Sequence, residues 1–142
     1  MSGRIILYLP GLLPNSSLRI LNSANSLTTD QLLFSVQDFP RGQVVYQANR
    51  MYNLKIDYAF PVSYPDYHLS WLIYINRIKA NLFFDAGTGL PEKNWFLSTG
   101  FDLTFDYHLL RSGLALESGI RMLYFPVARK IGAEFLFAFS VN

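Results

Sequence analysis

Few side chains in this sequence are of the kinds that carry catalysis, and they are widely spaced. There are two histidines, His68 and His108, and no cysteine among 142 residues. Asp102 and Asp106 precede His108, but residues four apart on a strand are about 13 Å apart, too far for a paired-carboxylate or hydrogen-bonded dyad. The sequence also contains no glycine-rich phosphate loop, metal-ligand spacing or nucleophile elbow. We therefore expect no catalytic residue, no metal site, no cofactor and no enzymatic activity.

The charged residues instead alternate with apolar ones. From residue 52 to 60 the apolar positions are Tyr52, Leu54, Ile56, Tyr58 and Phe60, and the polar positions between them are Asn53, Lys55 and Asp57. A side-chain period of two is that of a β-strand with one apolar and one polar face. The pattern returns in residues 75–87, 96–107, 114–125 and 132–142, which predicts five strands between residues 52 and 142.

Two shorter strands are expected earlier in the chain, over residues 4–9 and 17–24. Between them and the strand at 52–60 lies a connection of about 25 residues, residues 25–49, whereas most connections have about 4–6 residues. Such a segment is either a functional loop or a wrongly assigned region. We expect Pro61 to end the strand at 52–60 because proline cannot donate to a ladder, and residues 88–94 to form a loop.

The two faces of the expected strands differ in character. The charged residues Lys55, Asp57, Arg77, Lys79, Asp85, Asp102, Asp106, Glu117, Arg121 and Glu134 fall on one face, and Phe83 is the exception to the alternation. The opposite face contains Tyr52, Leu54, Ile56, Tyr58, Leu82, Phe84, Phe101, Leu103, Phe105, Ile120, Met122, Phe135, Phe137 and Phe139.

Composition and strand length favour a membrane for the apolar face. Apolar residues make up 51% and charged residues 15%, against the usual quarter. The expected strands have about 9–12 residues, close to the 9–11 that a tilted strand needs to cross a bilayer. No stretch is long and apolar enough for a transmembrane helix. We therefore expect an all-β, antiparallel transmembrane β-barrel in contact with membrane lipid. The net charge of +2 is spread out, so we expect no nucleic-acid partner.

Three features resemble the carboxy-terminal end of bacterial surface-antigen barrels, the superfamily of the BamA-type outer-membrane insertases and the two-partner secretion transporters. Phe39-Pro40-Arg41-Gly42 resembles the Arg-Gly-aromatic tip of the long sixth extracellular loop, although Gln43 stands where the family usually has an aromatic residue. Residues 82–87, Leu-Phe-Phe-Asp-Ala-Gly, resemble its aromatic-aromatic-Asp-x-Gly strand end. Five strands follow the Arg-Gly motif, and the chain ends in the fifth.

This resemblance implies that residues 1–142 are the carboxy-terminal portion of such a barrel, about seven of sixteen strands. It implies a location in the bacterial outer membrane, with the carboxy terminus on the periplasmic side. The implied function is insertion of outer-membrane proteins or translocation of polypeptides, with unfolded outer-membrane proteins as clients. Seven strands have two unpaired edges, so the remaining barrel strands or a partner chain are needed to complete the barrel.

The resemblance also implies roles for single residues. Arg41 would fold back into the lumen and pair with Asp57 and Asp85. The loop motif is Phe39, Pro40 and Gly42, the strand-end motif is Phe83, Phe84 and Gly87, and the closing strand at the lateral gate contains Gly132 and Phe139.

Two alternatives stay open. The chain could belong to a structural or passive pore-forming outer-membrane barrel, as a subunit of a larger assembly. It could also be a soluble ligand-binding β-barrel, in which the apolar face lines the core, because the period of two is the same in both settings.

Overall fold

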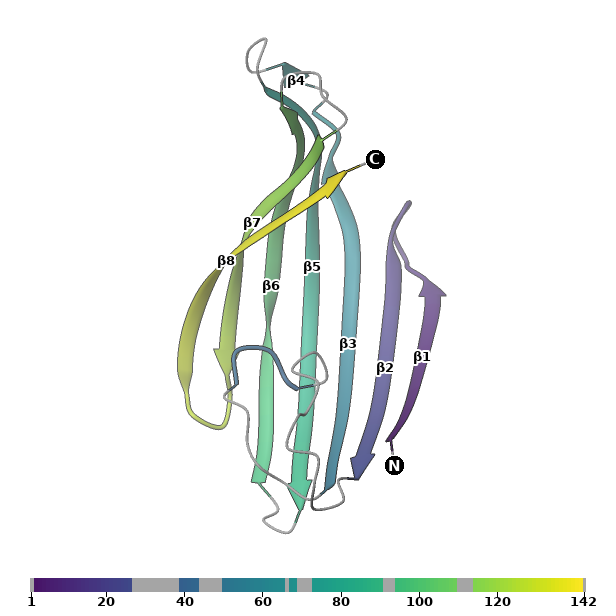
Figure 1. Ribbon diagram of the computed structural model, residues 1–142, viewed down its shortest axis with the longest axis vertical. Coiled ribbons are helices and arrows are strands. Elements are labelled where there is room, and N and C mark those ends of the chain that lie inside the picture. Colours follow the sequence, from purple (N-terminus) through teal and green to yellow (C-terminus); the bar gives the residue numbers. More distant parts are fainter. Residues whose placement is uncertain are drawn as a thin grey trace.

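A computed structural model describes residues 2–26, 39–43, 50–65, 67–68, 73–90, 94–109 and 114–141. This part of the chain consists of strands and turns (Figure 1). The strands are β1 (Ser2–Pro10), β2 (Ser17–Ser26), β3 (Arg50–Ser63), β4 (Tyr67–His68), β5 (Ile73–Leu90), β6 (Asn94–Leu109), β7 (Leu114–Phe125) and β8 (Lys130–Val141). Among the described residues, no helix is both long and apolar enough to cross a membrane.

The strands form one antiparallel sheet in the order β1-β2-β3-β5-β6-β7-β8, and the short β4 pairs with β5 beside this path. Each long strand therefore pairs with its neighbour in the sequence. Strands β3, β5 and β6 run along the long axis, whereas β8 crosses the view obliquely, so the sheet is twisted and curved (Figure 1). The sheet is open, with β1 and β8 at its edges. The expected all-β, antiparallel class is confirmed.

Two predicted strand ends are wrong. β3 does not stop at Pro61 but continues to Ser63. Pro61 lies opposite Lys79, and the register shifts between Pro61 and Ser63, so a bulge accommodates the missing donor. The expected loop at residues 88–94 is also shorter than predicted, because β5 continues to Leu90 and β6 begins at Asn94.

The register sorts the charged residues onto one face, here called the polar face. Arg19 lies opposite Asp57 on β3, and Asn81, Asp102, Arg121 and Glu134 lie opposite one another across β5, β6, β7 and β8. Burial alternates with the same period: Met51, Asn53, Lys55 and Asp57 of β3 are buried, and the residues between them are exposed or half-buried. The other face, here called the apolar face, exposes large side chains on every long strand except β2, among them Ile5, Tyr52, Leu82, Phe101, Ile120 and Phe135.

A cluster of buried apolar side chains lies on the polar face. It consists of buried Phe39 and Met51, with Phe96 packed against them. Phe39 belongs to residues 39–43, here called the loop tip, which lies over the sheet near one end of β5 and β6 (Figure 1). The loop tip therefore covers part of a face that is otherwise lined by charged groups.

Candidate functional site

The loop tip is a tight turn that its sequence encodes. The N–H group of Gln43 donates to the carbonyl oxygen of Pro40 (3.3 Å), which closes a four-residue turn. Gly42, the third residue of this turn, has φ +68°. A type II turn needs positive φ at this position, which glycine adopts without steric cost. The Arg41-Gly42 pair therefore presents the arginine from a bent, pre-shaped backbone.

Apolar and close-packed contacts hold the start of the loop tip on the sheet. The Phe39 ring packs against the Phe96 ring at a centroid distance of 5.3 Å. Pro40 is fully buried and lies over Gly87 of β5, where an added Cβ would come within 2.9 Å of Pro40 Cγ and 2.6 Å of Asn53 Oδ1. Gly87 thus gives the loop tip room to reach the sheet.

Arg41 makes the polar contacts of the loop tip. Its Nη2 donates to Asp57 Oδ1 at 2.5 Å, and its backbone N–H donates to Asp85 Oδ2 at 3.0 Å. Its Nε also lies 3.7 Å from Asp85 Oδ2. The guanidinium stacks over the Phe83 ring, with Cζ 4.5 Å from the ring centroid, in cation–π geometry. The Arg41 side chain is only 14% exposed, and that of Asp85 is 0% exposed.

These contacts connect the loop tip to a row of polar side chains that crosses the sheet. Arg19 of β2 donates two hydrogen bonds to Asp57 Oδ2 (3.1 and 2.7 Å), and Asn81 donates to both Asp57 and Asp102. Further along, Arg121 of β7 bonds both oxygens of Asp102 (2.7 and 3.1 Å) and reaches Glu134 of β8 at 3.3 Å. The row thus spans six strands, from β2 to β8: Arg19, Asp57, Asn81, Asp102, Arg121 and Glu134.

A second, more exposed cluster of charges lies nearer the other end of the sheet. Arg77 and Lys79 of β5 both pair with Asp106 of β6, at 2.7 and 2.9 Å. Lys79 also pairs with Glu117 of β7 at 3.1 Å. Acidic and basic groups thus face one another on neighbouring strands, which is the stabilising arrangement in a sheet.

The structure brings together the three residues of the expected loop anchor, Arg41, Asp57 and Asp85. Phe83 and Phe84 of the strand-end motif point to opposite faces: Phe83 is buried under Arg41, and Phe84 is exposed. None of the fourteen residues expected on the apolar face is buried. Gly132 and Phe139 lie in β8 at the edge of the sheet, and no described strand pairs with its free side.

The aspartates and histidines considered as catalytic candidates make ion pairs and ring contacts with other residues. Asp102 and Asp106 belong to the two ion-pair groups described above. Both histidine rings lie beside Tyr74, with His68 at 4.7 Å and His108 at 6.4 Å between ring centroids. No group of three or more metal-ligating side chains occurs within the part of the chain that the structure describes.

Sequence reasoning missed the apolar patch under the loop tip. Met51, Phe83, Phe96 and Leu123 lie on the polar face beside the loop tip or beneath it. Two pairs of adjacent residues in the sequence indicate this patch, Phe83-Phe84 and Leu123-Tyr124. Adjacent residues of a strand point to opposite faces, so each pair must put one large apolar side chain on the polar face. Gln43, the departure from the family motif, donates from Nε2 to the Leu97 carbonyl oxygen at 3.4 Å.

Comparison with protein-family models, with curated proteins and with solved structures finds no match to this chain. The resemblance to surface-antigen barrels therefore depends on the motifs and on their order along the chain. In the structure the Arg-Gly turn contacts Asp57 and Asp85.

Proposed function

We propose that this chain is the carboxy-terminal part of an outer-membrane β-barrel of the surface-antigen type, in a protein that inserts outer-membrane proteins or translocates polypeptides. In this proposal the polar face lines a wet lumen and the apolar face contacts lipid. The loop tip is then an extracellular loop that folds back into the lumen. The carboxy terminus is periplasmic, since the strands place it at the end opposite to the start of β3 (Figure 1).

The distribution of exposed side chains supports the membrane setting over a soluble barrel. A soluble barrel would bury its apolar face in a dry core, with charged groups outside in water. Here the ion pairs lie on the face that the loop tip covers, whereas Leu82, Ile120 and Phe135 are exposed on the other. Exposed apolar surface of this extent requires a partner, and lipid is the partner that fits a face of long apolar strands.

The open edges support a larger closed barrel. β1 and β8 each leave a row of backbone N–H and C=O groups without a strand partner among the described residues. In lipid each unsatisfied group costs several kcal/mol, so strands that cross a bilayer must close on themselves or on others. The remaining barrel strands or a partner chain would close this sheet.

The observation that carries the proposal is the docked Arg41 turn. A fork-shaped guanidinium paired with two carboxylates on neighbouring strands fixes both the position and the angle of a loop. It also holds that loop across the passage that a translocated segment would use. The loop tip is thus suited to a transporter or insertase, in which passage of polypeptide through the lumen is controlled.

The test is Arg41→Ala in the complete protein, with Arg77→Ala as the matched control on the same face. We expect Arg41→Ala to lower the yield of folded outer-membrane clients or of secreted polypeptide at least tenfold, and Arg77→Ala to leave it within twofold. Single-channel conductance separates the passive pore: a steady open conductance in the unaltered protein, together with client yields unchanged by Arg41→Ala, would contradict the proposal.

A further inference from the structure

The turn between β1 and β2, residues 11–16, presents two leucine side chains at its tip. Leu12 is 98% exposed and Leu13 is 50% exposed. No charged residue occurs in residues 5–18, so neither the turn nor the strand ends beside it carry a charge. The turn between β7 and β8, by contrast, contains Arg129. The β1–β2 turn is therefore an apolar tip without the charged groups that would favour water.

The same turn is held against a side chain of the apolar face. Tyr58 of β3 lies on that face, where its ring packs beside that of Phe60 at a centroid distance of 5.7 Å. Tyr58 Oη accepts a hydrogen bond from the Leu13 N–H at 3.2 Å and lies 3.2 Å from Ser16 Oγ. The ring also packs on Gly11, where an added Cβ would lie 2.9 Å from Tyr58 Cε2. The turn thus lies on the side of the sheet that we assign to lipid.

The backbone of the turn makes hydrogen bonds within the turn itself. The Gly11 N–H donates to the Ser16 carbonyl oxygen (3.0 Å), and the Ser16 N–H donates to the Leu13 carbonyl oxygen (3.2 Å). The Leu13 N–H also donates to Ser16 Oγ at 3.0 Å, and Pro14 has no N–H to satisfy. Internal bonds of this kind are needed where water is excluded, because an unpaired backbone group is costly in an apolar environment. The turn is therefore suited to a site within lipid.

We propose that the β1–β2 turn is a membrane anchor, in which Leu12 and Leu13 lie among the acyl chains of the periplasmic leaflet and Tyr58 holds the turn in place. β1 and β8 run in the same direction, so the turn lies at the end of the sheet where β8 ends, which is periplasmic in the proposed orientation (Figure 1). Lipid is the occupant that fits, because the two leucines extend the apolar face beyond the strands and no charged group accompanies them.

This inference rests on the proposed membrane setting and assigns a separate role to the turn. The two can fail independently, since different positions report on them. Phe101 of β6 is exposed on the apolar face and reports on the membrane setting, whereas Leu12 reports on the turn. Ser17, an exposed residue at the start of β2 beside the turn, lines a cavity on the polar face with Arg77 and is the matched control.

The test is depth-dependent fluorescence quenching of the complete protein in phospholipid vesicles. A fluorophore is attached to Leu12→Cys, Phe101→Cys or Ser17→Cys, and the lipids carry a nitroxide either near the headgroup or near the end of the acyl chain. We expect the shallow nitroxide to quench Leu12→Cys about twofold more strongly than the deep one, because a turn at a strand end lies near the headgroups. Phe101→Cys should show the reverse order, and Ser17→Cys should be quenched weakly by both.

A second variant tests the role of Tyr58 as the positioning residue. Tyr58→Phe removes the acceptor of the Leu13 N–H, so we expect it to reduce the quenching at Leu12→Cys by about half and to leave Phe101→Cys unchanged. Tyr52→Phe, on the same strand and the same face, should alter neither. Unchanged quenching at Leu12→Cys in Tyr58→Phe would overturn the role of Tyr58.

The remaining outcomes separate the anchor from the proposed function. Quenching at Phe101→Cys but not at Leu12→Cys would overturn the anchor and leave the proposed function intact. A label at Leu12→Cys that neither the nitroxides nor aqueous iodide quenches would place a protein on the turn, which also overturns a lipid anchor. Absence of quenching at both Phe101→Cys and Leu12→Cys would contradict the membrane setting itself.

Discussion

The two ends of the polar face use the same kinds of charged pair in very different surroundings. Under the loop tip, Arg41 and Asp85 are buried, with side chains 14% and 0% exposed. In the cluster at the other end, Arg77 is 42% exposed and Glu117 41%. A buried pair that loses one partner leaves an uncompensated charge, whereas an exposed pair contributes little. We therefore expect burial under the loop tip, and not pairing alone, to determine how much each arginine contributes to the stability of the fold.

Arg41→Met tests the buried end and should have the largest effect. It removes the guanidinium that pairs with buried Asp85 and one of the two that pair with Asp57, so we expect a loss of about 3–5 kcal/mol in the free energy of unfolding. Urea unfolding of the refolded protein in detergent, followed by tryptophan fluorescence, measures it. A loss below 1 kcal/mol would mean that burial under the loop tip does not set the strength of this pair.

Phe39→Ala separates the apolar part of the docking from the charged part. Truncating a buried phenylalanine costs about 3 kcal/mol, and here the loss falls on the contacts with Met51 and Phe96. We expect the loop tip to detach, so that trypsin cleaves after Arg41, a bond that docking protects in the unaltered protein. Phe135→Ala, at an exposed position of the apolar face, should leave that protection unchanged. Continued protection in Phe39→Ala would show that Arg41 alone is sufficient for docking.

Gly42→Ala tests the shape of the turn. Alanine is strained at φ +68°, and its Cβ would also lie 2.7 Å from Phe125 Cζ. We expect a cost of about 1–2 kcal/mol and faster trypsin cleavage after Arg41. Gly3→Ala is the matched control, since an added Cβ there meets nothing within 4 Å. Equal cleavage rates in the two variants would contradict the turn geometry.

Arg77→Met completes the comparison at the exposed end and should have the smallest effect. Asp106 keeps Lys79 as a partner, and the side chains of Arg77 and Asp106 are 42% and 19% exposed. We expect a loss of less than about 1 kcal/mol in the same urea experiment. A loss as large as that of Arg41→Met would show that the two ends are equivalent.

Sequence reasoning predicted the strands well because the period of two is a local property. It predicted fourteen residues for the apolar face, all of which are exposed or half-buried, and it predicted the strand at 114–125 with its observed bounds. It failed at Pro61, where a bulge between β3 and β5 decides the outcome. Propensity alone carries no information about such a register shift.

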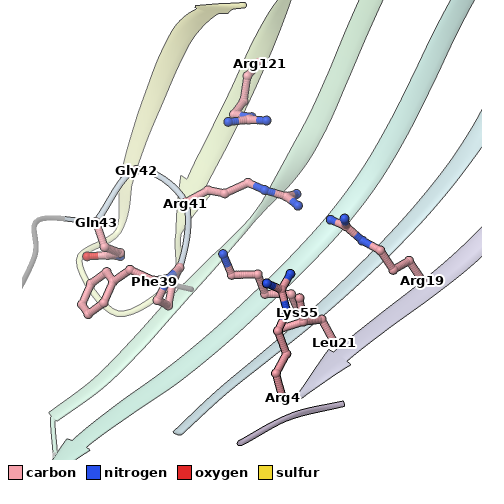
Figure 2. A pocket seen from close by; sticks show the side chains of 10 residues that line it. Arg4, Arg19, Leu21, Phe39, Arg41, Gly42, Gln43, Lys55 and Arg121 are labelled. Carbon is pink, nitrogen blue, oxygen red and sulfur yellow. The ribbon is translucent and has the colours of Figure 1, made fainter. Parts of the chain in front are cut away.

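The candidate site was only partly predictable. The family resemblance paired Arg41 with Asp57 and Asp85, which lie together in the structure. Alternation could not explain Phe83, because its place on the polar face makes sense only once the loop tip lies above it. A cavity beside the loop tip could not be predicted from the sequence either, since its lining residues Arg4, Arg19 and Lys55 lie on three strands that the register of the sheet brings together (Figure 2).

The central claim is that the apolar face contacts lipid and the polar face contacts water, and β6 tests it most directly. The chain has no cysteine, so single cysteines can carry a fluorophore at positions of either face. In vesicles containing nitroxide-labelled lipid, we predict strong quenching for Phe101→Cys, Leu103→Cys and Phe105→Cys and weak quenching for Ser98→Cys and Thr104→Cys. Equal quenching along the strand, or stronger quenching at Ser98→Cys and Thr104→Cys, would contradict the claim.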